Sequence, residues 1–249
     1  MNQDCQHSGV FITFEGGEGA GKTTHLTFLA RALRDAGREV VCLREPGGTA
    51  IGDQLRRVVL DTRNDAMAPE AELFIYEAAR AQLVREHIEP ALARGAVVLC
   101  DRYMDSTIAY QAYGRGLDRH FVHDANIFAS CGILPDRTLF LSCGSSPITG
   151  LKRATDDRAA DRMEQAGLDF HQRVACAFDD LARAYPDRIR RVQSGTYKHD
   201  TARSVCKAVA DLVGWDPDHL PFDTTYFAQA DSLHVNKADM SGDNEVGQR

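Results

Sequence analysis

Short apolar runs alternate with longer stretches of helical periodicity along most of the chain. Five runs have the composition of strands buried on both faces, and they are Val10–Phe14, Glu39–Leu43, Ala96–Cys100, Arg137–Leu141 and Ile189–Val192. Apolar residues recur with the helical period at about Lys22–Ala36, Thr49–Leu60, Pro69–Arg94, Asp105–Ala112, His120–Ser130, Leu168–Ala184 and Asp200–Val213. This alternation predicts an α/β fold with a doubly wound, five-stranded parallel sheet and helices on both faces. Ligands of such sheets bind at the carboxyl ends of the strands.

The pattern changes after Gly214. Residues 215–249 are acidic and polar, and their apolar positions have no sustained period. We therefore expect one domain over residues 1–214, followed by an acidic tail over 215–249 that is disordered or loosely docked. The aromatic residues that could anchor this tail to the body are Trp215, Phe222, Tyr226 and Phe227.

Charge and composition exclude several classes of function. The net charge of the 249 residues is −7, which argues against nucleic acid as the main partner. No apolar run is long enough to cross a bilayer, and the first residues are polar, so we expect neither a membrane span nor a signal peptide. The seven cysteines form no Cys-x-x-Cys pair, which indicates reduced thiols and a cytoplasmic protein.

The sharpest chemical signal is the segment GGEGAGKT, residues 16–23. Two glycines five apart, followed by lysine and a hydroxyl residue, fit the P-loop pattern in its required place between a strand and a helix. Its backbone N–H groups would bind phosphate oxygens, Lys22 would reach the β- and γ-phosphates, and Thr23 would ligate Mg²⁺. The loop alone does not separate a kinase from a GTPase or an ATPase. A guanine-reading signature at 236–239 (NKAD) lies in the polar tail and not at a strand end, which disfavours a GTPase.

Polar clusters also follow the second and third predicted strands. Residues 44–49 read REPGGT, where two glycines allow an irregular loop and Thr49 can cap the next helix. From this chemistry alone, a binding loop and an ordinary turn are equally open. Asp101 ends the third strand, so its carboxylate would face the P-loop and hold Mg²⁺ directly or through water. Arg102 is placed to clamp a second anion.

Two helical faces have side chains that could recognise a base. Thr107, Tyr110 and Gln111 share one face of a helix, and their hydroxyl, ring and amide can read the edge of a planar base. Tyr76 and Arg80 are four residues apart, which places a ring beside a guanidinium. Each face also has a plainer interpretation. The first could be a solvated polar face, and the second a core aromatic residue with a surface arginine.

Taken in order, these segments resemble the thymidylate kinases of bacterial type. The resemblance runs from about residue 10 to residue 213 and rests on FITFEGGEGAGKTT, REPGGT, EAARAQ, DRYMDSTIAYQAYGRG and DRMEQAGLDFHQRV. It implies a P-loop NTPase-type fold with a mobile lid at about 150–167. It implies transfer of the γ-phosphoryl group of ATP to dTMP with Mg²⁺, giving dTDP and ADP. It also implies a homodimer, and the surface helices at Asp53–Leu60 and Glu70–Val84 are candidates for its interface.

The resemblance implies a role for each matching residue. The residues that would cradle the ATP phosphates are Gly16, Gly17, Glu18, Gly19, Ala20, Gly21, Lys22, Thr23 and Thr24. Those that would hold Mg²⁺ are Thr23 and Asp101. Those that would line the dTMP side are Glu45, Arg56, Tyr76, Arg80, Arg102, Thr107, Tyr110 and Gln111. In this set Tyr76 would stack on the base, Thr107 and Gln111 would read its edge, and Arg102 would bridge the two phosphates.

The lid departs from the dense run of arginines that many bacterial relatives carry. Residues 151–162 read LKRATDDRAADR, which keeps three arginines but dilutes their charge with aspartates. Because the P-loop has Gly19 and no arginine, the lid would supply the cation that stabilises the transition state. We predict Arg158 for this role, with Arg153 second, so that the predicted catalytic set is Lys22, Arg102, Arg158, Arg153 and Glu18. Two alternatives stay open: a kinase of another nucleotide such as dUMP, and a non-catalytic nucleotide-binding relative.

Overall fold

A five-stranded parallel sheet forms the centre of the computed structural model, which describes residues 8–142, 147–156, 159–195 and 197–233. The strand order is β2-β3-β1-β4-β5, and the strands are β1 (Val10–Glu15), β2 (Val40–Arg44), β3 (Val97–Asp101), β4 (Arg137–Ser142) and β5 (Ile189–Gln193). All four pairings are parallel. The predicted sheet is therefore confirmed, and each strand begins and ends within one residue of its predicted bounds.

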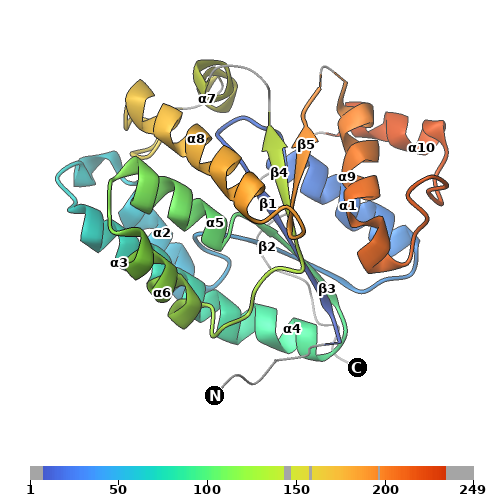
Figure 1. Cartoon of the computed structure of the whole chain (residues 1–249), viewed down its shortest axis with the longest axis horizontal. Coiled ribbons are helices and arrows are strands. Elements are labelled where there is room, and N and C mark those ends of the chain that lie inside the picture. Colours follow the sequence, from blue (N-terminus) through green and yellow to red (C-terminus); the bar gives the residue numbers. More distant parts are fainter. Residues whose placement is uncertain (1–7, 143–146, 157–158, 196, 234–249) are drawn as a thin grey trace.

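Helices cover both faces of the sheet (Figure 1). The helices of one face are α1 (Lys22–Asp35), α9 (Lys198–Val213) and α10 (Thr224–Ala228). Those on the other side are α2 (Ala50–Leu60), α3 (Pro69–Leu83), α4 (Glu89–Ala93), α5 (Met104–Thr107), α6 (Arg119–Ala129) and α8 (Leu168–Ala184). Side chains alternate along β1, so that Ile12 and Phe14 pack against α1 and α9 while Phe11 packs in the opposite core. Such two-sided burial explains why the strands are continuous apolar runs.

Two predicted helices contain wider π-helical turns. The helix predicted over residues 69–94 is α3, a π-helical turn η2 (Val84–Ile88) and α4 in succession. The helix predicted over 105–112 is α5 followed by a second π-helical turn, η3 (Ile108–Gly114). Such turns are rare and occur often at functional sites. The short helix α7 (Pro147–Thr155) belongs to the expected lid, and a 3₁₀ turn η1 (Thr62–Asn64) follows α2.

Part of the expected C-terminal tail is packed against the body. Beyond Gly214 the structure describes residues 215–233, with α10 and a 3₁₀ turn η4 (Gln229–Ser232). Phe227 is only 2% exposed and lies in the same apolar core as the residues of α1 and α9. Residues 234–249, with the signature at 236–239, lie outside the described residues, and the domain boundary at residue 214 stays a prediction. No helix in the described part of the chain is long and apolar enough to cross a membrane.

Candidate active site

The P-loop connects the end of β1 to the start of α1, as predicted. Gly16 has a φ of 133°, and a Cβ atom there would collide with the carbonyl oxygen of Leu141. Only glycine fits this close approach of two backbones. The Lys22 ammonium donates to the carbonyl oxygens of Gly16, at 3.2 Å, and Gly17, at 2.9 Å. Burial lowers the pKa of Lys22, with the positive charge of Arg102 as the next cause. A phosphate in the loop would give this buried cation a charged partner.

Thr23 and Asp101 bring two oxygen ligands together beside the loop. The Thr23 hydroxyl donates to Asp101 Oδ2 at 2.6 Å. The contact follows from the sheet, because Asp101 is the register partner of Phe14 at the carboxyl ends of β3 and β1. Among the described residues no group of three His, Cys, Asp or Glu side chains could hold a metal ion. Mg²⁺ needs few protein ligands when it is bound together with phosphate and water, so the pair fits a Mg²⁺ site of the nucleotide-dependent kind.

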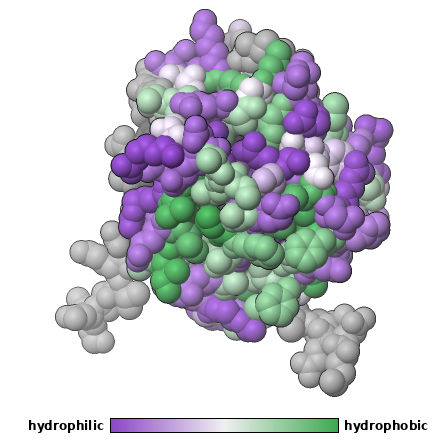
Figure 2. Space-filling model, turned by 90° about the vertical axis from the view of Figure 1, so that its left-hand side faces the viewer, coloured by the Kyte–Doolittle hydropathy of each residue, from purple (hydrophilic) through white to green (hydrophobic). Residues whose placement is uncertain are grey.

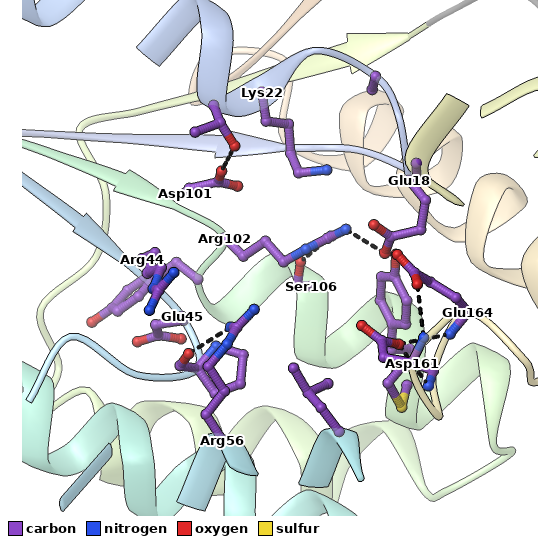
Figure 3. A pocket seen from close by; sticks show the side chains of 18 of the residues that line it. Glu18, Lys22, Arg44, Glu45, Arg56, Asp101, Arg102, Ser106, Asp161 and Glu164 are labelled. Atoms are coloured by element: carbon purple, nitrogen blue, oxygen red, sulfur yellow. Dashed lines mark hydrogen bonds and ion pairs between the residues drawn. The ribbon is translucent and has the colours of Figure 1, made fainter. Parts of the chain in front are cut away.

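Arg102 spans the space between the P-loop and the pocket beyond it (Figure 3). Its guanidinium donates to the carbonyl oxygen of Gly16 at 3.0 Å and to Glu18 Oε1 at 2.6 Å. Tyr110 donates its hydroxyl proton to the same Glu18 oxygen at 2.9 Å. Burial would raise the pKa of Glu18, but the charges of Arg102 and Lys22 lower it to about 2. Glu18 is therefore ionised, and it holds the Arg102 guanidinium between the P-loop and the rest of the pocket.

One pocket of about 420 Å³ joins the P-loop to the predicted acceptor side. It is lined by most of the predicted site residues, which are Glu18, Gly19, Ala20, Gly21, Lys22, Thr23, Thr24, Glu45, Arg56, Tyr76, Arg80, Asp101, Arg102, Thr107, Tyr110, Gln111 and Arg153. Gly16 and Gly17 belong to the loop but do not line the pocket. Arg158 lies outside the described residues. The second lid candidate, Arg153, reaches the pocket from α7.

Arg80 is buried and paired with other side chains of the protein, which the sequence did not indicate. The residue is 1% exposed, and its guanidinium donates to Glu45 at 2.6 Å and to Glu77 at 3.0 Å. Asn126 of α6 accepts a further hydrogen bond from it. Burial raises the pKa of Glu45 to about 7 against the opposing charge of Arg80. Arg80 thus borders the pocket while it neutralises two buried carboxylates.

Three buried polar atoms that lack a hydrogen-bond partner belong to residues lining this pocket. They are Arg44 Nε, Glu45 Oε1 and Thr107 Oγ1. Buried polar groups are normally paired, so these atoms indicate where a polar ligand would be bound. Arg44 is a functional candidate that the sequence analysis did not single out. Its position at the end of β2, in the REPGGT segment, was the available signal, and Figure 3 shows it on the same side of the pocket as Glu45 and Arg56.

A second missed residue is Glu15, at the end of β1. Its carboxylate accepts hydrogen bonds from the backbone N–H of Tyr103, at 2.8 Å, and from that of Ser106, at 3.1 Å. Burial, together with the charge of Asp105, raises the pKa of Glu15 to about 7. These bonds fix the turn that follows Arg102, whose φ is 72°. The residue positions Arg102 through the backbone, and its place directly before the P-loop was the only sequence signal.

The last lid arginine, Arg162, is an anchor and does not line the pocket. Its guanidinium donates to Glu72 at 2.6 Å and to the carbonyl oxygen of Val59 at 2.7 Å. Glu72 is fully buried and also accepts from Arg115, at 2.9 Å, and from Gln111, at 2.9 Å. Arg162 thereby joins the end of the expected lid to α2 and α3.

Comparison with known proteins identifies the family of this chain. The family model described as thymidylate kinase matches residues 14–205. The chain is 48% identical to a thymidylate kinase of Gloeobacter violaceus, over 80% of this chain and 94% of that protein. It is 46% identical to a thymidylate kinase of Geobacter sulfurreducens, over 82% of this chain and 96% of that protein. A crystal structure of thymidylate kinase from Ehrlichia chaffeensis superposes with a TM-score of 0.66 at 31% identity, covering 81% of this chain and 98% of that one. The chain belongs to the thymidylate kinase family.

Proposed function

We propose that this chain transfers the γ-phosphoryl group of ATP to dTMP, giving dTDP and ADP, with Mg²⁺ bound beside the P-loop. The observation that carries the proposal is the position of Arg102. Its guanidinium contacts the P-loop at Gly16 and Glu18 and lines the pocket that also holds Tyr76, Thr107 and Gln111. A phosphate bound in the P-loop and a phosphate bound on the acceptor side of the pocket would both contact this one cation.

The residues divide into a donor half and an acceptor half. The P-loop and Lys22 bind the ATP phosphates, and Thr23 and Asp101 hold Mg²⁺, which neutralises phosphate charge when it is bound. On the acceptor side Tyr76 offers a ring to thymine, and the unpaired Thr107 hydroxyl offers a hydrogen bond to its edge. Arg44 and Arg56 provide positive charge for the dTMP phosphate.

The transfer itself requires little covalent chemistry from the protein. A phosphate oxygen of dTMP attacks the γ-phosphorus, a new P–O bond forms, and the bond to the β–γ bridging oxygen breaks to release ADP. Arg102 and Lys22 stabilise the charge that develops between the two phosphates. Holding both nucleotides in line supplies the remaining acceleration.

Release of ADP with ATP, Mg²⁺ and each of dTMP, dUMP, dCMP, AMP and GMP tests the proposal. We expect the highest kcat/KM with dTMP. The value for dUMP should be about 10- to 200-fold lower, because one methyl group in a pocket is worth about 1–3 kcal/mol. Equal rates with dUMP would favour the broader kinase, and binding of both nucleotides without turnover would indicate a non-catalytic relative.

Arginines of the lid are expected to contribute to the rate. Arg158→Ala should lower kcat by about 10- to 100-fold and Arg153→Ala by less, because two arginines share a role that elsewhere one arginine performs. Lys152→Ala is the matched control, since Lys152 is an exposed cation next to Arg153 that does not line the pocket. Steady-state kinetics decide the order. Wild-type kcat in Arg158→Ala would show that this arginine is not the catalytic one.

We also propose that the chain is a homodimer through the outer face of α2, α3 and α6. Figure 2 shows a continuous apolar region on this side of the molecule. The exposed apolar side chains of these three helices include Ile51, Phe74, Phe121 and Phe128, which are 51%, 55%, 52% and 88% exposed. The rings of Phe74 and Phe121 contact each other across α3 and α6, with centroids 6.2 Å apart. Apolar patches of this kind mark interfaces, and a two-fold axis would pair the patch with itself.

Phe128→Glu is expected to convert the dimer to a monomer, because it would place two charges in one apolar interface. Sedimentation or light scattering at micromolar concentration measures the change in mass. Tyr185→Glu is the matched control, since Tyr185 is 49% exposed at the end of α8, away from this face. An unchanged mass in Phe128→Glu, or a wild-type protein that is already monomeric, would contradict the proposed interface.

A further inference from the structure

The segment of residues 215–233, called here the C-terminal segment, lies beyond the residues that the family model matches. It is nevertheless attached to α1, the helix that starts at the P-loop. The ring of Phe227 stacks on Phe28 of α1 with centroids 5.8 Å apart, and Tyr226 contacts Phe28 edge to face at 5.7 Å. The Tyr226 hydroxyl donates to Asp35 at the end of the same helix, at 2.5 Å. These contacts run from Phe28 to Asp35, about two turns of α1.

The same segment is attached to the start of α9. Asp231 accepts a hydrogen bond from the backbone N–H of His199 at 3.3 Å, and its other oxygen lies 2.7 Å from His199 Nδ1. The Lys198 ammonium donates to the carbonyl oxygen of Leu233 at 3.4 Å. The first N–H groups of a helix have no partner within it, and Tyr197, at the N-cap of α9, forms no side-chain cap. Asp231 therefore supplies the missing cap from outside the helix.

The segment that leads from β5 to α9 lies close to the P-loop. Ser194, just after β5, has its hydroxyl oxygen 3.9 Å from the position that a Cβ atom would take on Gly21. Lys198, the first residue of α9, lies close enough to His25 of α1 for its charge to act on that side chain. Burial, followed by the charge of Lys198, lowers the pKa of His25 to about 4. Because His25 lies in the first turn of α1, the start of α9 acts on the start of α1, whereas the C-terminal segment contacts α1 farther along, at Phe28 and Asp35. Figure 1 shows α10 beside α9 and α1.

The sheet order decides which nucleotide this unit would meet. β2 and β3 lie on one side of β1 and carry the acceptor pocket at their carboxyl ends, with Arg44, Glu45 and Asp101. β4 and β5 lie on the other side of β1. Since β2 and β3 carry the acceptor side, we expect a nucleotide whose phosphates occupy the P-loop to extend its base to the other side of β1, toward β4 and β5.

We propose that the C-terminal segment positions the phosphate donor by holding the start of α9 against α1, with Asp231 as its main positioning residue. The inference rests on the proposed function only for the identity of the donor side. Asp231 does not line the pocket, and its effect would reach the donor through α9 and Lys198. Loss of the cap frees the start of α9, so donor binding weakens while acceptor binding, on the far side of β1, does not.

Asp231→Ala, Asp231→Asn and the matched control Asp218→Ala test the proposal in the full chain. Asp218 is an exposed aspartate of the same segment, and its backbone N–H donates to Asp216 within that segment. Calorimetry with ADP and with dTMP measures the two Kd values without turnover. Asp231→Ala should raise the Kd for ADP about three- to tenfold, the range of a lost helix cap, and leave that for dTMP within about twofold. Asparagine is an equally good cap, so Asp231→Asn should bind ADP like wild type.

Hydrogen exchange supplies a second measurement that requires no nucleotide. The amides at the start of α9, from His199 onward, should exchange faster in Asp231→Ala and at the wild-type rate in Asp231→Asn and Asp218→Ala. Wild-type affinity for ADP in Asp231→Ala, or equal weakening for ADP and dTMP, would overturn the proposal. Failure of wild type to phosphorylate dTMP would contradict the proposed function, whereas these binding and exchange results would still decide the role of the segment.

Discussion

Replacing Arg102 by alanine is expected to lower kcat with dTMP by a factor on the order of 10³, since an arginine that stabilises transferring phosphoryl charge is worth about 10³–10⁵ in rate. The guanidinium stands between the P-loop and the acceptor pocket and contacts both Gly16 and Glu18. Alanine would leave two phosphates facing each other without this cation. Glu18 would in addition lose the charge that holds its pKa at about 2, which places an unpaired carboxylate beside the reacting phosphates.

A comparison of the change in kcat with the change in KM separates a catalytic role of Arg102 from a role in binding. If Arg102 acts mainly in the transition state, kcat falls far more than KM rises. Arg102→Lys keeps a charge but loses the fork that contacts two groups at once, so its kcat should lie between the values for wild type and alanine. Arg183→Ala, at an arginine whose side chain is 76% exposed, controls for loss of a positive charge. A kcat for Arg102→Ala within about tenfold of wild type would contradict the assigned role.

Local patterns predicted the sheet and the P-loop because both are encoded by neighbouring residues. The strands are short runs buried on both faces, and the P-loop combines fixed glycine spacing with a lysine. The pairing of Thr23 with Asp101 also followed, since parallel strands place their carboxyl ends at one edge of the sheet. In these cases a property of a few consecutive residues determines the result.

Local sequence patterns could not predict side-chain partners that come from elements far apart in the chain. Arg80 and Arg162 are arginines on exposed-looking helical or lid sequence, yet each is buried by carboxylates from other elements, Glu45 and Glu72. Glu15 looks like an ordinary strand end until the turn after Arg102 is placed against it. The C-terminal segment has no sustained period because only a few residues, Phe227 among them, are buried. Tertiary contacts, and not propensity, decide such positions.

Replacing Arg80 by methionine is expected to destabilise the fold by about 3–5 kcal/mol, the usual result of removing one partner from a buried ion pair. Glu45 and Glu77 would remain buried with no cation between them, and both lie on elements that shape the acceptor pocket. At about 2–4 °C for each kcal/mol in a chain of this size, the Tm should fall by roughly 10 °C. Thermal unfolding followed by circular dichroism measures the shift.

The nearby Arg85→Met is the matched control for Arg80→Met. The Arg85 side chain is 62% exposed and pairs with Glu89 on the surface, where such a pair is worth about 0–1 kcal/mol. Adding Glu45→Gln and Glu77→Gln to Arg80→Met should recover part of the stability, because neutral amides cost less to bury than carboxylates. A wild-type Tm in Arg80→Met together with a raised KM for dTMP would instead assign Arg80 to substrate recognition alone. The buried charges on both sides of this guanidinium argue for the larger, structural effect.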